Sequence, residues 1–146
     1  MIWFHWKDIK SDVYLDGVIK IDKTNFDSDK HYIQEGIDLF NSEIQWDGMF
    51  TLEVAKKRIF ENDEITFILT HNGEVLGHSW HDMMWWYNIY ISKKRPQGIS
   101  IPFCKHFFNE VEYDELYGYT DWWNVAATKL FIKTGATVLH PLKVMF

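Results

Sequence analysis

The chain has 146 residues, a mass of 17.6 kDa and a net charge of −6, from 15 Lys and Arg against 21 Asp and Glu; this is the length of one domain. Its 47% hydrophobic and 25% charged residues exclude a disordered chain, and its acidity argues against a nucleic-acid binder that depends on clustered Lys and Arg. The 18% of aromatic residues, including 8 tryptophans, must fill a core or a pocket.

No apolar run is long enough to span a membrane, and the first residues lack the features of a secretion signal. Cys104 is the only cysteine, which excludes an internal disulfide and agrees with a reducing compartment. We therefore expect a single cytoplasmic domain over residues 1–146.

The first sixty residues predict a strand followed by two helices. Residues 1–9 alternate loosely and suit a strand, whereas 13–21 could be a short strand or an irregular connection. A helix beginning at Ser28, capped by Ser28 or Asp27 and ending near Asp47-Gly48, places four apolar residues on one face: Ile33, Ile37, Phe40 and Ile44. A second helix, capped by Thr51 and stopping before Asn62-Asp63, directs three residues inward: Leu52, Ala55 and Ile59.

The middle of the chain predicts a β-hairpin. Residues 65–70 and 75–80 alternate with a period of two and are joined by His71-Asn72-Gly73-Glu74. Asn-Gly accepts the positive φ of a type I′ turn, which makes this a strong hairpin signal. A further strand is expected over about 86–92, followed by Lys93-Lys94-Arg95.

The last third predicts two helices with a strand between them. A helix follows Gly98 directly, tolerates Pro102 in its first turn and directs four residues inward: Ile101, Cys104, Phe108 and Val111. Residues 115–120 suit a strand, Asn124 caps a helix that ends at Gly135, and residues 136–146 form a last strand or a short hairpin turning near His140-Pro141. The predicted class is α+β, with about four helices flanking a mixed, mostly antiparallel sheet of about six or seven strands.

A candidate anion site lies between a strand end and a helix start, at Arg95-Pro96-Gln97-Gly98-Ile99-Ser100. Free backbone N–H groups and the positive end of a helix dipole meet at such a place and bind anions, most often phosphate. Gly98 lets the backbone approach a ligand without a Cβ, Ser100 keeps the approach open and Arg95 adds a positive charge. The alternative is an ordinary strand-to-helix turn with a solvated basic run.

This segment resembles the acyl-CoA pyrophosphate loop of the GCN5-related N-acetyltransferase (GNAT) family. The family pattern is Arg or Gln, two residues, Gly, one residue, then Gly or Ala; Arg95, Gly98 and Ser100 fill it, with Ser at the last position. Residues 72–77 are similar to the family's second hairpin and residues 124–136 to its last helix. The resemblance covers about Ile65 to Ala136, roughly half of the chain.

The resemblance implies a GNAT-like acyl-CoA N-acyltransferase fold with acetyl-CoA as co-substrate. The strand before the loop would splay from its neighbour and hold the pantetheine arm through the main chain of Ile89, Tyr90 and Ile91, and Asn124 would contact the arm. The family's tyrosine that protonates the leaving thiolate falls at Phe131, which cannot donate a proton. Catalysis would then need water or another group.

The reaction that the resemblance implies is direct attack of a neutral amine on the acyl thioester, with the oxyanion held by a backbone N–H. A base or water chain must take a proton from the arriving ammonium. The candidates are His78, His81 and Asp82, expected beside the acyl end, and also Asp121. Because the two imidazoles are three residues apart on a strand, they point to opposite faces and would not share a metal ion. The alternative is a histidine pair that lies at the surface or lines a pocket.

Two aromatic runs, Met83-Met84-Trp85-Trp86-Tyr87 and Trp122-Trp123, could line an acceptor pocket and attract an ammonium group by cation–π interaction. Core packing or a subunit interface, as in a homodimer, is the favoured alternative. Cys104 is expected to be a small core residue rather than a nucleophile that carries an acyl group.

The sequence therefore predicts an N-acetyltransferase that acts on a small-molecule or protein amine, without a nucleic-acid or membrane partner. One alternative is a non-catalytic acyl-CoA-binding or interaction module on the same scaffold. The other is an aromatic-rich structural protein that resembles the family by accident.

Overall fold

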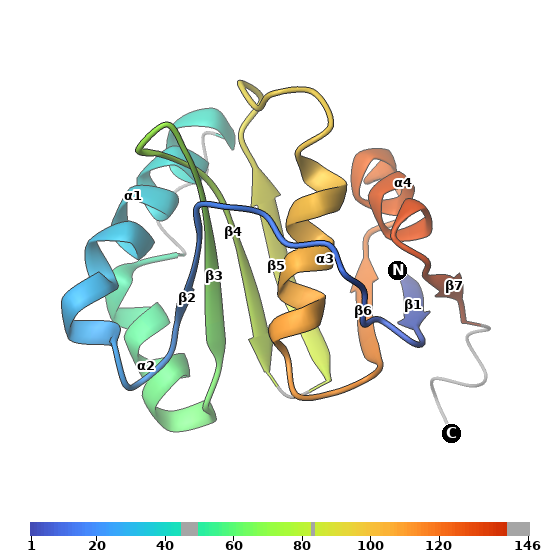
Figure 1. The fold of residues 1–146 in the computed structure, drawn as a ribbon, viewed down its shortest axis with the longest axis horizontal. Coiled ribbons are helices and arrows are strands. Elements are labelled where there is room, and N and C mark those ends of the chain that lie inside the picture. The colour runs from blue at the N-terminus through green and yellow to red at the C-terminus, as the bar shows by residue number, and fades with distance from the viewer. Residues whose placement is uncertain (45–49, 83, 140–146) are drawn as a thin grey trace. The chain divides into compact units, whose positions relative to one another are not determined.

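The computed structural model describes residues 1–44, 50–82 and 84–139 (Figure 1). The expected helix end at Asp47-Gly48 and the expected turn at His140-Pro141 lie outside these residues. In chain order the elements are β1 (Ile2–Trp6), β2 (Val18–Ile21), α1 (Phe26–Ile44), α2 (Leu52–Asn62), β3 (Ile65–His71), β4 (Glu74–Asp82), β5 (Trp85–Ile91), α3 (Ser100–Glu110), β6 (Leu116–Thr120), α4 (Val125–Lys133) and β7 (Thr137–Val138). None of the helices in these ranges is long and apolar enough to cross a membrane.

The strands form a mixed sheet in the order β2-β3-β4-β5-β6-β1-β7. The pairs β2–β3, β3–β4, β1–β6 and β1–β7 are antiparallel, whereas β5 and β6 are parallel. The parallel ladder joins Trp85 to Tyr117 and Trp86 to Gly118, at the first two residues of β5. The predicted α+β class with a mostly antiparallel sheet is confirmed.

The chain divides into two compact units, and each is described by itself. The hairpin unit comprises residues 16–82 and 88–97, and the terminal unit comprises residues 1–15, 83–87 and 98–146. Strand β5 contributes its first three residues to the terminal unit and the rest to the hairpin unit.

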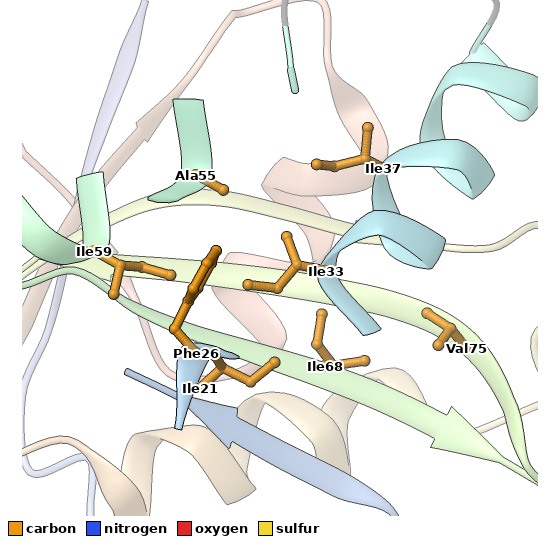
Figure 2. Close-up of a cluster of buried hydrophobic side chains, with 8 residues drawn as sticks. All are labelled: Ile21, Phe26, Ile33, Ile37, Ala55, Ile59, Ile68 and Val75. Atoms are coloured by element: carbon orange, nitrogen blue, oxygen red, sulfur yellow. The ribbon is translucent and has the colours of Figure 1, made fainter. Parts of the chain in front are cut away.

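The hairpin unit buries one face of β2, β3 and β4 against α1 and α2. Figure 2 shows side chains from all five elements meeting in one cluster: Ile21, Phe26, Ile33, Ile37, Ala55, Ile59, Ile68 and Val75. Their burial stabilises the unit by the removal of apolar area from water. The prediction for the far end of α1 was wrong, because Ile44 is exposed. The helix also begins at Phe26, so Asp27 and Ser28 lie in its first turn and do not cap it.

The predicted cap of α2 and the predicted turn between β3 and β4 are confirmed. The Oγ1 atom of Thr51 accepts a hydrogen bond from the Val54 N–H at 3.2 Å and caps α2. Asn72 and Gly73 have φ values of 52° and 76°, as a type I′ turn requires. The flanking strands pair with His71 opposite Glu74.

The terminal unit packs α3 and α4 on one face of its strands through aromatic rings. Cys104, Phe108 and Val111 are buried as predicted, but Ile101 is only half-buried. Phe103 and Phe107, which the predicted helical face omitted, are completely buried. Two neighbouring rows of side chains on α3 are therefore buried. The apolar face of the helix is wider than the single row of residues, spaced three and four apart, that the sequence predicted.

Candidate functional site

The segment from Lys93 to Ile99 connects β5 to α3 and has the geometry of an open turn. Gly98 adopts a φ of +82°, and a Cβ built on it would meet no atom within 4 Å. The Arg95 N–H and one guanidinium N–H of Arg95 both donate to the Ser92 carbonyl oxygen, at 3.1 and 3.2 Å. The turn therefore folds back on the end of β5 and leaves open space beside Gly98.

Helix α3 begins directly after this turn, without a side-chain cap. Its N-cap residue is Ile99, which makes no capping hydrogen bond and has no polar side-chain atom to make one. The first helical residue is Ser100, and Pro102 lies in the first turn as predicted. An uncapped helix N-terminus keeps its amide groups for another acceptor and carries the positive end of the helix dipole.

Glu43, in the last turn of α1, holds the beginning of this loop. One carboxylate oxygen accepts hydrogen bonds from the Tyr90 hydroxyl at 2.7 Å and the Lys93 N–H at 2.8 Å, and the other accepts from the Ser92 hydroxyl at 2.6 Å. Burial would raise the pKa of Glu43, but these hydrogen bonds outweigh it and hold the pKa below its usual value. Glu43 is thus an ionised group that fixes three positions of the segment entering the loop.

The sequence interpretation missed Glu43, because its partners lie 47 to 50 residues away along the chain. One signal was present: a carboxylate in the last turn of a helix faces the negative end of the dipole, which disfavours it. An acidic residue at such a position indicates a specific partner elsewhere.

Strands β4 and β5 approach closely where the loop begins. A Cβ on Gly77 would lie 2.6 Å from the Tyr90 carbonyl oxygen, so only glycine permits this spacing. The Ser92 N–H donates to the Leu76 carbonyl oxygen at 2.7 Å. One edge of the β5 end is therefore bonded to β4, next to the main chain of Ile89, Tyr90 and Ile91.

His78 lies on the face of β4 that α1 covers and is buried. Its ring stacks on Trp80 with a centroid separation of 5.3 Å, and the Phe40 ring lies 6.0 Å away. Burial lowers the pKa of His78 to about 4, so the imidazole is neutral at pH 7. Its Nε2 atom has no hydrogen-bond partner among the described residues.

His81 lies on the opposite face of β4, as the spacing predicted. Its Nδ1 atom is 3.4 Å from the Ser79 hydroxyl oxygen, and its ring is 5.5 Å from the Phe67 ring. Burial lowers the pKa of His81 to about 3. The alternative of a histidine pair at the surface is wrong, because both side chains are buried. Asp82 is half-buried at the end of the strand.

The two site residues predicted on α4 lie in the terminal unit. The Oδ1 atom of Asn124 accepts a hydrogen bond from the Ala127 N–H at 3.1 Å, which confirms the predicted helix cap. Phe131 is buried, and its ring centroid lies 4.9 to 5.1 Å from those of Phe4, Trp6 and Trp86. Their predicted contacts with a cofactor remain predictions.

The aromatic runs do not form one group. Trp86 is buried, whereas Trp85, Trp122 and Trp123 are 39%, 74% and 65% exposed. Core packing is therefore the wrong interpretation for the last two. Cys104 is a buried core residue as predicted, and burial raises the pKa of its thiol.

Comparison with known proteins identifies the fold. No protein-family model matches the chain, and no curated protein matches it. Among solved structures, an aminoglycoside acetyltransferase from an uncultured soil metagenomic sample superposes with a TM-score of 0.64 at 15% identity, over 84% of this chain and 91% of that one. A GCN5-related N-acetyltransferase from Sphaerobacter thermophilus gives 0.57 at 12% identity, over 95% of this chain and 48% of that one. An integron cassette protein from the mobile metagenome of V. cholerae gives 0.56 at 15% identity, over 84% and 86%.

The chain therefore has the fold of the GNAT acetyltransferases, which confirms the fold that the resemblance implied. The low sequence identities show the fold alone.

Proposed function

We propose that this chain is an acetyltransferase that transfers the acetyl group of acetyl-CoA to a primary amine, by direct attack in a ternary complex. The observation that carries the proposal is the turn before α3: Gly98 at a φ of +82° with open space beside it, followed by a helix without a side-chain cap. A diphosphate is the ligand that such a cradle of amides binds.

The proposed cofactor site uses main-chain groups more than side chains. The amides from Gly98 to Ser100, with Arg95, Pro96 and Gln97 before them, would hold the pyrophosphate. The main chain of Ile89, Tyr90 and Ile91 would hold the pantetheine arm, and the bond from Ser92 to Leu76 supports this because it fixes the strand from its other edge. Asn124 and Phe131 are proposed as further contacts.

The proposed chemistry needs a proton acceptor and a proton donor. His78 is the first candidate for the acceptor, directly or through water, since it is neutral at pH 7 and its buried Nε2 has no described partner. His81 and Asp82 are further candidates. Phe131 cannot protonate the leaving thiolate, so water would supply that proton.

The proposed acceptor is defined only as a primary amine. The fold neighbours include an acetyltransferase structure that contains sisomicin, an aminoglycoside. Aminoglycosides therefore belong in the first panel of amines, together with amino acids, monoamines and peptides with a free amino group.

A second candidate function, a non-catalytic acyl-CoA-binding module, is favoured by Phe131. Acetyl-CoA binding without release of free CoA across the amine panel would support it. If Phe131→Tyr gains turnover that the parent chain lacks, the scaffold is a weakened enzyme instead.

The test of the cofactor site uses two glycines with the same backbone requirement. Gly98 and Gly73 both have positive φ, and a Cβ on either meets no atom within 4 Å. Asparagine tolerates this backbone and adds a side chain. We expect acetyl-CoA to raise the melting temperature of the parent chain and of Gly73→Asn, but not of Gly98→Asn. An equal shift in all three proteins would overturn the loop assignment, and no shift in the parent chain would overturn the proposed function.

A further inference from the structure

The terminal unit carries a second group of aromatic rings on the sheet face opposite α3 and α4. Successive side chains of a strand point to opposite faces. In β1 this alternation places Trp3 and His5 on one face and Phe4 and Trp6 on the other; Trp3 is half-buried, whereas the other three side chains are buried. The rings on the Trp3 face, which we call the aromatic platform, are Trp3, Trp85, Tyr117 and Tyr119.

The rings of the platform form a continuous row. The Trp3 centroid lies 4.9 Å from that of Tyr119 and 5.8 Å from that of Trp85, and Trp85 lies 5.6 Å from Tyr117. The His5 ring extends the row, because it stacks on Tyr117 at 4.4 Å with an interplanar angle of 8°. Three separate parts of the chain therefore supply one surface.

The platform is open to solvent. Trp85 is 39% exposed and Tyr119 is 40% exposed, while Trp3 and Tyr117 are half-buried. The opposite face of the same strands is covered, since Trp86 packs on Phe107, Phe108 and Phe131. An exposed group of large rings at a defined place indicates a binding surface.

Two carboxylates flank β6, the strand that supplies two rings of the platform. Glu115 precedes β6, and its carboxylate lies 3.2 Å from Nε2 of His5; Asp121 follows the same strand. The strands β1, β6 and β7 and residues 85–87 contain no lysine or arginine, and the exposed Lys7 directly follows β1. The faces of indole and phenol rings also attract cations. The ring faces and the two carboxylates therefore favour a cation with apolar atoms.

We propose that the aromatic platform binds an organic ammonium ion on an aliphatic or alicyclic skeleton. The apolar part would lie on the rings of Trp3, Trp85 and Tyr119, with the charge directed toward Glu115. The role of this ion as the acceptor of acyl transfer rests on the proposed function, whereas its binding to the platform does not depend on that function.

The size of the platform favours a small ligand over a second copy of the chain. Four partly exposed rings offer on the order of 300 Å², whereas a stable protein interface buries about 800 Å² on each partner. A neutral ligand of the same shape would gain stacking but no attraction to the carboxylates. The binding of a neutral ligand of the same shape is therefore compared with the binding of the ammonium ion.

The experiment labels the full chain with 5-fluorotryptophan and records ¹⁹F NMR spectra during titration with cyclohexylammonium, without any CoA. Single Trp→Phe variants assign the signals. We expect saturable shifts of the Trp3 and Trp85 signals, little change at Trp122 and Trp123, and binding by the neutral cyclohexanol that is at least about fivefold weaker.

Variants of the platform have matched controls on the same unit. Trp85→Leu and Tyr119→Leu should each weaken binding by about fivefold or more. Tyr119→Phe keeps a ring and should stay within about twofold, as should Trp122→Leu, which removes a tryptophan that is 74% exposed. Glu115→Gln should weaken binding by about threefold while leaving cyclohexanol unaffected.

Four results would overturn the proposal: no saturable shift, equal binding of cyclohexanol, shifts confined to Trp122 and Trp123, or shifts that follow protein concentration without ligand, which would make a second copy the occupant. The acetyl-CoA test is separate, so failure of either proposal is recognised independently of the other.

Discussion

The strands of the terminal unit have aromatic side chains on both faces, and the two faces differ in what covers them. On one face Trp6, Trp86 and Phe131 meet ring to ring and are almost completely buried. On the other face Trp85 and Tyr119 keep about two fifths of their surface in water. The residue types are the same, and only the packing of α3 and α4 differs.

This contrast separates stability from binding. A ring surrounded by other rings contributes its full apolar area and its edge-to-face contacts to folding. A ring that stays half in water contributes less, and its open face remains for a ligand. Residue type therefore does not indicate the role of a tryptophan here, whereas its place in the strand does.

The largest expected effect compares two consecutive tryptophans. Trp86→Ala should lower the free energy of unfolding by about 3–5 kcal/mol, because it leaves a cavity among Phe107, Phe108 and Phe131. Trp85→Ala should lower it by about 1 kcal/mol or less. Urea unfolding at pH 7.5 measures both, and equal losses would contradict the difference between the faces.

Buried and exposed histidines should likewise differ in how they change stability with pH. The folded pKa of His78 is about 4, against 6.5 in the unfolded chain. Between these values the unfolded state binds more protons, so stability falls as pH falls, by up to about 1.4 kcal/mol per pH unit for this group. His78→Phe should remove this dependence, and the free energies of unfolding of variant and parent at pH 7.5, 6.0 and 5.0 measure it.

The pH dependence of His78→Phe must be compared with that of the parent chain, because Glu64 changes stability with pH in the opposite direction to His78. Burial raises the pKa of Glu64 from 4.5 to about 7, so between these pH values the folded state binds more protons than the unfolded state. His31→Phe is the control, since His31 is exposed on α1. An identical pH dependence in His78→Phe and the parent would show that the ring is not buried in solution.

Adding or removing a single hydroxyl group should also affect stability differently on the two faces. Phe131→Tyr places a hydroxyl among the buried rings and should cost about 1–3 kcal/mol unless it finds a partner. Tyr119→Phe removes a hydroxyl from the open face and should change stability by less than about 0.5 kcal/mol. Thermal unfolding measures both variants. A loss of stability in Tyr119→Phe equal to that in Phe131→Tyr would contradict the difference between the two faces.

The smallest expected effect concerns two glutamates of α1. Glu43→Gln loses the ionised acceptor for Ser92, Tyr90 and Lys93 and should cost about 1 kcal/mol, since the group is partly exposed. Amide exchange over residues 92–98 should accelerate, and the affinity for acetyl-CoA should fall. Glu35→Gln, at an exposed position of the same helix, should change neither. Unaltered exchange in Glu43→Gln would show that the carboxylate does not hold the loop.

The sequence was informative where a local rule determines the structure. The Asn72-Gly73 turn, the Thr51 cap and the glycine before α3 all follow from conformational or capping preferences of single residues, and each lies where it was predicted. The order of the elements followed in the same way except at residues 13–21, where the sequence left a strand or an irregular connection open and the structure has β2. This order was sufficient for the fold class.

Features that depend on tertiary contacts were not predictable in this way. Ile44 has the spacing of a core residue but lies beyond the covered part of α1, and Phe103 is buried because the covered face of α3 is wide. Glu43 on α1 accepts hydrogen bonds from residues at and after the end of β5, which are distant in the chain. The alternation of β1 separates Trp3 from Trp6, but only the positions of the helices decide which of them is buried.

Amide chemical shifts of the ¹⁵N-labelled chain during titration with CoA test whether the turn before α3 binds the cofactor, because they report each backbone N–H of that turn. We expect the largest shifts at Gly98, Ile99 and Ser100, and we expect them to saturate with the ligand. Saturable shifts elsewhere with these three amides unmoved, or no shifts at all, would contradict this expectation.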